Sequence, residues 1–320
     1  MPSRRRALVI GIDDYPSMPL HGCVNDANAI ASLLEANHDG SPNFEVVLRT
    51  SETAQITRAQ LRSDLERLFA HGSDTDVALF YFAGHGTEND LGGYIVTPDF
   101  ESGDEGVNLS EILSRANASA AKECVIILDS CMSGALGASP SANNNAASVS
   151  EGVSILTAAR AGQTAAEING NGMFTELVCA ALEGGAADVL GNVSAAAVYT
   201  YVEEALGAWD QRPLFKAHLG KVESLRKTSP SVSVQTLRLL PTWFPTADHI
   251  FPLDPEYEDT QPNSDPTKVA IFKQLQKCRD AKLVEAVDEE FLYFAAMNST
   301  GCKLTLLGQR YRKLAAERRI

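Results

Sequence analysis

The chain has 320 residues, of which 44% are hydrophobic and 21% charged, so it is neither disordered nor membrane-like in composition. A net charge of −14 argues against nucleic acid as a partner, and no apolar run approaches the roughly 18 residues of a membrane helix, so no membrane contact is expected. The six cysteines are scattered without a CxxC pair, which argues against zinc and favours reduced thiols in the cytoplasm.

The chain begins with basic residues followed by an apolar stretch, an order that superficially resembles a signal peptide. That stretch is only about six residues long and runs into Asp13 and Asp14, so we expect a buried first strand instead. 

Short apolar runs alternate with helical patterns over the first 220 residues. Continuous apolar runs are typical of strands covered on both faces, as in a parallel sheet. Alternating strands and helices predict an α/β fold, an α/β/α sandwich around a mostly parallel six-stranded sheet. Thr57 is expected to cap one of the helices. The predicted strands are 6–13, 44–50, 76–84, 124–130, 153–159 and 213–220, and the predicted helices are 25–36, 57–70, 172–185 and 194–209.

Two stretches lack a regular pattern. Residues 134–152 are small and polar and predict a long flexible loop. Residues 241–267 contain prolines that disfavour helices and central strands. About three short helices are expected after them, so we divide the chain into a first domain over 1–225, a proline-rich linker over 226–266 and a small helical module over 267–320.

Two predicted strands end in chemically active residues, one in Gly84-His85-Gly86 and the other in Asp129-Ser130-Cys131. Carboxyl ends of parallel strands lie at one edge of a sheet, so His85 and Cys131 are expected there. A cysteine hydrolase needs a thiol, a base and oxyanion donors, for which the backbone N–H groups of Gly86 and Cys131 are candidates. Spacing alone leaves the alternatives of a buried cysteine and a turn histidine open. No third side chain is singled out to orient His85, and a backbone carbonyl would serve.

Four blocks resemble the caspase-like cysteine peptidases, most closely the metacaspases and related prokaryotic caspase homologues. The resemblance runs from about Arg5 to Gly220 and implies a caspase-haemoglobinase fold and endopeptidase activity. It implies Cys131 as nucleophile and His85 as general base and acid. The blocks are "ALVIGIDDYPSMPLHGCVNDANAIASLLE", "DVALFYFAGHGTENDLGGYIVTPD", "CVIILDSCMSG" and "ILTAARAGQTAAEINGNGMFTELVCAALEG".

The resemblance also bears on the residue preceding the cleaved bond, P1. The arginine with which caspases recognise aspartate would fall near Leu20 and is absent. Asp26 and Asp129 match the acidic residues of the metacaspase S1 pocket. Two carboxylates favour Arg or Lys at P1 through charge-assisted hydrogen bonds. Simpler roles stay open: Asp26 as a charge at a helix N-terminus, and Asp129 as a strand-end acceptor.

Some relatives are activated by calcium bound to acidic residues near the active site. Here Asp90, Asp99, Asp104 and Glu105 follow His85, but their spacing is not that of an EF-hand. We expect a solvated acidic loop, no metal site and no required cofactor, with Ca²⁺ left open.

Many relatives are cleaved in the loop after the nucleophile. No Lys, Arg or Asp occurs between Met132 and Ala159, so an enzyme that cuts after basic residues would find its first site at Arg160. We therefore expect activation by a partner, a ligand or another protease, with proteins as substrates.

The last part of the chain differs in charge. Residues 268–320 hold 11 Lys or Arg and 6 Asp or Glu, against 16 and 35 in the remainder, which suggests two parts with different roles. Residues 304–315 resemble the last helix of small winged-helix-like modules. We expect this module to bind an activator or regulatory protein. The alternatives for this module are a cap on the peptidase and a nucleic-acid sensor that gates it. The alternative for the chain as a whole is a non-catalytic caspase-fold scaffold. For a bacterial protein, the resemblance implies a role in antiviral defence or cell death.

Overall fold

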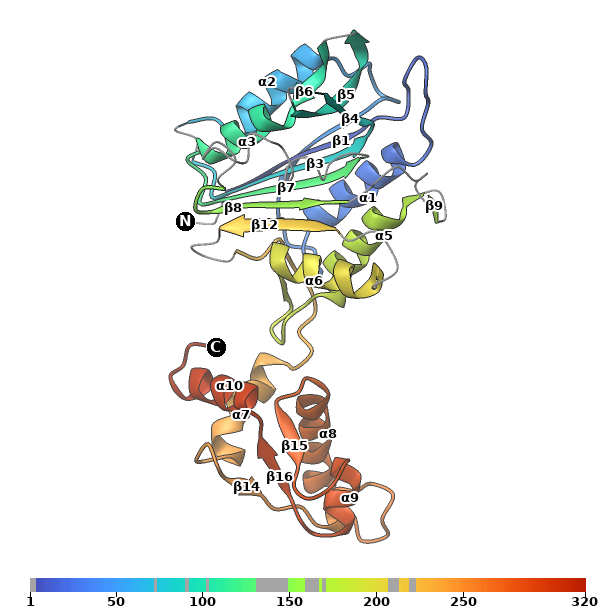
Figure 1. Cartoon of the computed structure of the whole chain (residues 1–320). Coiled ribbons are helices and arrows are strands. Elements are labelled where there is room, and N and C mark those ends of the chain that lie inside the picture. The colour runs from blue at the N-terminus through green and yellow to red at the C-terminus, as the bar shows by residue number, and fades with distance from the viewer. Residues whose placement is uncertain are drawn as a thin grey trace. The chain divides into compact units, whose positions relative to one another are not determined.

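The computed structural model describes residues 4–71, 74–89, 92–101, 104–130, 149–158, 167–168, 171–206, 213–218 and 223–320, and of residues 105, 167, 168 and 171 only the backbone. The chain divides into two compact units, Met1–Ala187 with Asn192–Thr228, and Asp188–Gly191 with Ser229–Ile320 (Figure 1). Each has a hydrophobic core made of its own residues.

A six-stranded sheet forms the centre of the first unit, as predicted. Its order is β12-β8-β7-β3-β1-β2, and neighbouring strands are parallel except for β12, which runs antiparallel to β8 (Figure 1). The central strands β3 and β7 are buried along their whole length, which explains their uninterrupted apolar sequences. The strands are β1 (Arg5–Gly11), β2 (Glu45–Thr50), β3 (Val77–Gly84), β7 (Glu123–Ser130), β8 (Val153–Thr157) and β12 (Leu214–His218).

Helices cover both faces of this sheet (Figure 1). Alternate side chains of each strand point to opposite faces, so β3 directs Tyr81 toward one core and Phe82 toward the other. The first core includes residues of α1 (Cys23–Glu35), α5 (Met173–Ala180) and α6 (Ala195–Leu206), and the second includes residues of α2 (Arg58–Leu68) and α3 (Leu109–Asn117). The prediction for Thr57 is confirmed, because its side chain accepts a hydrogen bond from the Gln60 amide at the start of α2.

A small antiparallel sheet replaces the solvated loop that we expected after His85. It consists of β4 (Gly86–Asn89), β5 (Gly92–Glu101) and β6 (Asp104–Asn108), in that order. Its apolar residues Ile95 and Val107 are buried in the core on the α2 and α3 side. The expectation of a loop was therefore wrong: these two residues bury the stretch against the central sheet, and polar and glycine residues around them hid the strand pattern.

Short strand pairs complete the first unit. β9 (Glu167–Ile168) pairs with β10 (Asn171–Gly172), and β11 (Asn192–Val193) pairs with β13 (Arg226–Lys227). A π-helical turn, Ala181–Gly185, follows α5. Most of the predicted loop at 134–152 and the candidate cleavage site Arg160 lie outside the described residues.

The second unit combines helices with a three-stranded sheet of order β14-β16-β15. Part of the stretch predicted as a linker contributes to its core, since Trp243, Phe244, Leu253 and Tyr257 are buried there. The elements are α7 (Val234–Trp243), β14 (Ile250–Phe251), a 3₁₀ turn (Pro255–Tyr257), α8 (Pro266–Asp280), β15 (Val284–Ala286), α9 (Leu292–Met297), β16 (Cys302–Leu304) and α10 (Leu306–Ala316).

Within the described ranges of both units, no helix has the length and apolar character needed to cross a membrane.

Candidate active site

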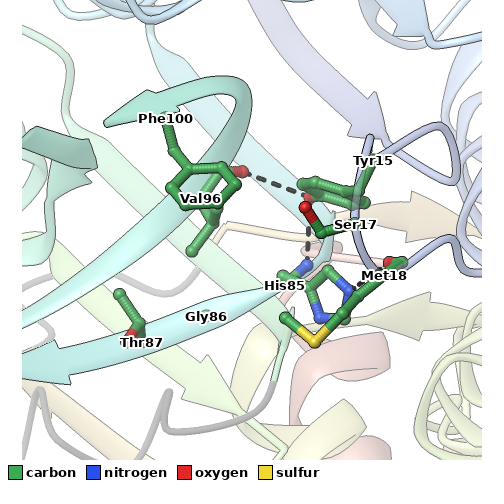
Figure 2. Close-up of a pocket in the computed structure, with 8 residues that line it drawn as sticks. All are labelled: Tyr15, Ser17, Met18, His85, Gly86, Thr87, Val96 and Phe100. Carbon is green, nitrogen blue, oxygen red and sulfur yellow. Dashed lines mark hydrogen bonds between the residues drawn. The ribbon is translucent and has the colours of Figure 1, made fainter. Parts of the chain in front are cut away.

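His85 lies between the end of β3 and the start of β4, at the carboxyl edge of the central sheet. Its Nε2 atom is 2.7 Å from the carbonyl oxygen of Met18, in the segment between β1 and α1 (Figure 2). A carbonyl can only accept a hydrogen bond, so Nε2 carries the proton and Nδ1 of the neutral ring is left as a base. The backbone carbonyl of Met18 thus orients the His85 ring, a role for which the sequence had singled out no side chain.

Tyr15 fixes the backbone of His85, and the sequence contained no signal for this role. Its hydroxyl accepts a hydrogen bond from the His85 amide at 3.0 Å and donates one to the Val96 carbonyl at 3.2 Å (Figure 2). The Val96 amide in turn donates to the His85 carbonyl at 2.9 Å. The phenol is therefore inserted into the ladder between β4 and β5. Burial raises the pKa of Tyr15, which keeps the hydroxyl protonated and able to donate.

The two glycines beside His85 have different functions. A Cβ atom on Gly84 would lie 2.6 Å from the Tyr15 hydroxyl, so Gly84 provides space rather than a turn. Gly86 is opposite Ile95, and the bond between Val96 and His85 makes theirs a non-hydrogen-bonded pair. The Gly86 N–H therefore points away from β5.

A mostly apolar pocket of about 180 Å³ opens beside the imidazole. Tyr15 belongs to the core on the α2 and α3 side of the sheet, and Val96 packs against that core. The pocket therefore adjoins this face. Its lining residues are Tyr15, Ser17, Met18, His85, Gly86, Thr87, Val96 and Phe100 (Figure 2).

β7 lies next to β3, and the register pairs Ser130 with Gly84. His85 and Cys131 are the residues that directly follow this pair. The prediction that their strands leave the same edge as neighbours is thus confirmed. Cys131 itself lies outside the described residues, so its role as nucleophile and its oxyanion N–H remain predictions.

The two predicted pocket carboxylates are both buried. Asp26, in the first turn of α1, accepts hydrogen bonds from the Gly172 amide at 3.1 and 3.2 Å. Asp129 accepts one from the Thr175 hydroxyl at 2.8 Å. Strand-end bonding of Asp129 and a helix N-terminal position of Asp26 are thus both observed, and their binding of a P1 side chain stays a prediction.

Asp26 and Asp129 both bond to the start of α5, Asp26 to its N-cap Gly172 and Asp129 to Thr175. Burial raises the pKa of Cys23, and Asp13, Asp129 and Asp26 raise it further. The same two carboxylates, after burial, raise the pKa of Tyr81, which belongs to the core covered by α1 and α5. Sequence reasoning missed Thr175, Cys23 and Tyr81, because only the folded chain brings them to this face.

The five cysteines in the described part of the chain are free thiols. Burial is the largest cause raising the pKa of each, to about 11 for Cys124 and to about 12 for Cys179, Cys278 and Cys302. All five therefore stay protonated at neutral pH and are weak nucleophiles.

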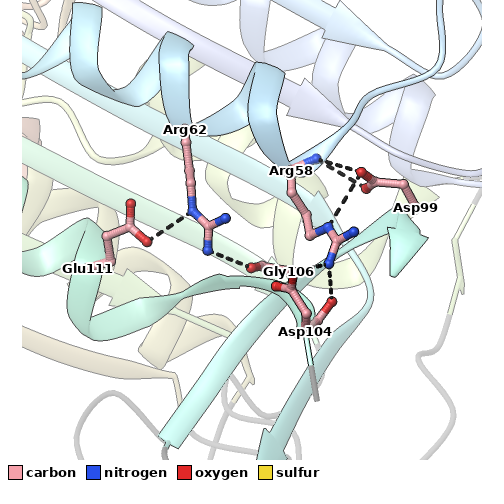
Figure 3. A network of polar contacts seen from close by, with 6 residues as sticks. All are labelled: Arg58, Arg62, Asp99, Asp104, Gly106 and Glu111. Atoms are coloured by element: carbon pink, nitrogen blue, oxygen red, sulfur yellow. Dashed lines mark hydrogen bonds and ion pairs between the residues drawn. The ribbon is translucent and has the colours of Figure 1, made fainter. Parts of the chain in front are cut away.

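Asp99 and Asp104 both form ion pairs with Arg58, Asp104 remaining exposed to solvent and Asp99 partly buried (Figure 3). Asp90 and the side chain of Glu105 lie outside the description. No group of acidic, histidine or cysteine side chains suited to a metal occurs among the described residues.

Comparisons with known proteins agree with this architecture. Residues 4–230 match the family model of the caspase domain. Metacaspase-8 from Arabidopsis thaliana is 28% identical over 151 residues, which are 41% of this chain and 38% of that protein. The chain thus matches well under half the length of this curated relative. The crystal structure of protein GSU0716 from Geobacter sulfurreducens aligns with a TM-score of 0.50 at 15% identity, covering 71% of this chain and 98% of that one, a likeness of fold alone.

Proposed function

The chain belongs to the caspase-domain family of peptidases, and we propose that it is a cysteine endopeptidase that cleaves proteins after Arg or Lys. The observation that carries the proposal is the pairing of Gly84 with Ser130, together with a histidine whose Nε2 is held by the Met18 carbonyl. The base and the proposed nucleophile then follow adjacent positions on neighbouring strands.

In this mechanism the sulfur of Cys131 attacks the scissile carbonyl carbon and its proton passes to Nδ1 of His85. The N–H groups of Gly86 and Cys131 donate to the oxyanion. His85 then protonates the leaving amine, and an acyl-thioester remains on Cys131. Water, deprotonated by His85, releases the carboxylic acid and regenerates the thiol. Tyr15 and Met18 hold the imidazole in place, so little reorganisation is needed.

The buried pair Asp26 and Asp129 supports the choice of Arg or Lys at P1. Asp26 bonds to Gly172 and Asp129 to Thr175 at the start of α5, which supports an acidic pair on the α1 and α5 side of the sheet edge. A guanidinium or ammonium group would be attracted strongly there because burial weakens solvent screening. The apolar pocket adjoins the opposite face. In a peptide bound across this edge of the sheet, with its P1 side chain at Asp26 and Asp129, the residue that follows the cleaved bond would therefore point toward Phe100.

Activation by a partner or an upstream protease remains part of the proposal, as does a role in defence or cell death in the cytoplasm. The second unit, with its separate core, is the candidate site for a regulatory protein. Free thiols among the described cysteines support a reducing compartment.

Fluorogenic peptides that differ only at P1 test the proposal. We expect the wild-type chain to cleave Arg or Lys substrates, with loss of at least about a thousandfold in Cys131→Ala and His85→Ala. Cys179→Ala, which removes a half-buried thiol from α5, is the control that keeps activity. Preference for Asp at P1 would refute the pocket assignment, and unchanged cleavage by Cys131→Ala would refute the nucleophile.

A further inference from the structure

The bulged part of β5 carries a wall of the pocket beside His85. The pairing of β5 with β6 is regular at Val96 and Gly106 but slips before Glu101 and Asp104. Residues 97–100 therefore lie outside the regular ladder. Phe100, in this bulge, is 41% exposed and lines the pocket. Contacts other than the hydrogen bonds between β5 and β6 must therefore hold Phe100 in position.

Arg58 makes the contacts that hold the bulge (Figure 3). Its amide donates to the Asp99 carboxylate at 3.1 and 3.3 Å, and its Nε at 3.4 Å. Its Nη1 donates to the Asp104 carbonyl at 2.7 Å and forms an ion pair with the Asp104 carboxylate. One arginine at the start of α2 thus contacts both β5, through Asp99, and β6, through Asp104.

The charge of Asp99 agrees with its contact to Arg58. Burial opposes ionisation of Asp99, but the hydrogen bonds from the Arg58 amide and the charge of its guanidinium act against burial, and the pKa of Asp99 lies below the ordinary value. Asp99 is therefore a carboxylate at neutral pH, and its charge is met by the guanidinium.

These residues do not fit a calcium ion. Calcium takes six to eight oxygen ligands at about 2.3–2.6 Å. Here the guanidinium occupies the space between the two carboxylates, and its positive charge repels a cation. The carboxylates of Asp99 and Asp104 therefore bind the Arg58 guanidinium rather than a metal ion.

We propose that Arg58 is the positioning residue of this pocket, and that by fixing Asp99 and Asp104 it makes the wall beside His85 independent of Ca²⁺. The inference rests on the proposed peptidase function. It predicts that Arg58 affects binding of the substrate residue beyond the cleaved bond, because Phe100 follows Asp99 directly in the chain.

The test uses the full chain dialysed against a calcium chelator and then titrated with CaCl₂. We expect the wild-type cleavage rate and melting temperature to stay unchanged. An activity that requires Ca²⁺, or a melting temperature that rises with it, would overturn the proposal.

Arg58→Met tests the positioning role, with Arg67→Met as the matched control. Arg67 is also on α2, but it pairs with Asp64 of the same helix. For peptides that extend beyond the cleaved bond, we expect Arg58→Met to raise KM about tenfold with little change in kcat, because a charge-assisted contact to the wall is lost. A short substrate with only a fluorophore beyond P1 is expected to change less. Equal KM values for Arg58→Met and Arg67→Met would refute the proposal.

Arg58→Lys is a second variant that tests the same role if Arg58→Met does not fold. It keeps the charge but loses the planar fork, so we expect partial recovery of KM. Hydrogen exchange provides a readout that needs no activity: the amides of residues 97 and 99–101 are expected to exchange about tenfold faster in Arg58→Met than in Arg67→Met. If wild-type chain cleaves no basic peptide, the proposed function fails, while equal exchange in the two variants refutes the positioning role by itself.

Discussion

At the residue scale, Tyr15 supports the site without taking part in the proposed reaction. Tyr15 is 4% exposed, and its ring centroid lies 4.5 Å from that of His85. Its hydroxyl occupies the place of a direct ladder bond between His85 and Val96. It therefore couples the position of the proposed base to β5, the strand that forms part of the pocket.

Tyr15→Phe is expected to lower the free energy of unfolding by about 1–3 kcal/mol, because the His85 amide and the Val96 carbonyl lose their partner. We expect kcat to fall about tenfold, since a misplaced imidazole transfers protons less efficiently. Urea denaturation and peptide kinetics measure the two effects. Tyr199→Phe, on α6 and half-buried, is the control, and a Tyr15→Phe variant as stable and active as this control would contradict the role.

At the element scale, a buried carboxyl joins the start of β7 to the end of the first unit. Glu123 is 1% exposed and accepts a hydrogen bond from the Glu223 amide at 2.8 Å. Burial, with the charge of Glu223, raises the pKa of Glu123, although the Glu223 amide and Arg5 act in the opposite direction. Compared with the unfolded chain, the folded state therefore favours the protonated form of Glu123.

Stability should consequently depend on pH through Glu123. Because its folded pKa is raised, its contribution is fully present below the ordinary glutamate pKa of about 4.3 and is lost as pH rises through the folded value. Glu123→Gln keeps an acceptor for the Glu223 amide, so we expect a smaller pH dependence and higher stability at neutral pH. Urea denaturation between about pH 4 and 8 measures it. Exposed Glu203→Gln is the control, and a Glu123→Gln curve parallel to the wild-type curve would contradict the prediction.

The same scale shows where prediction from the sequence stopped. The six strands of the main sheet were recognised because each is a local apolar run. β5 was missed, since it contains Pro98, Asp99 and two glycines and resembles a loop. Its Asp99 pairs with Arg58, which lies 41 positions earlier in the chain, and no local pattern reveals this pairing.

At the scale of the whole molecule, the two units have separate cores. Ile126 of β7 is buried in the first unit and Leu275 of α8 in the second. The second unit includes residues from the predicted proline-rich linker, because Trp243 and Phe244 pack into its core. Among the described residues, the side chains of each core come from its own unit.

We therefore expect two separable unfolding transitions in calorimetry. Leu275→Ala should destabilise one of them by about 2–5 kcal/mol through loss of packing, and Ile126→Ala the other by a similar amount. Peptide cleavage should survive Leu275→Ala at temperatures below both transitions. A single transition that shifts equally in both variants would contradict the independence of the cores.

The sequence by itself determined the main sheet, most of its helices, the family resemblance and the position of His85 at a strand end. These features depend on local periodicity and on short motifs, which the chain carries wherever it folds. Only the tertiary structure decided that Met18 and Tyr15 hold His85, that Asp26 meets Gly172, and that Arg58 holds Asp99. In each case the partners lie at least about 40 residues apart. Hydrogen bonds and ion pairs depend on distance in space, and packing of the helices on the sheet is what brings these residues together.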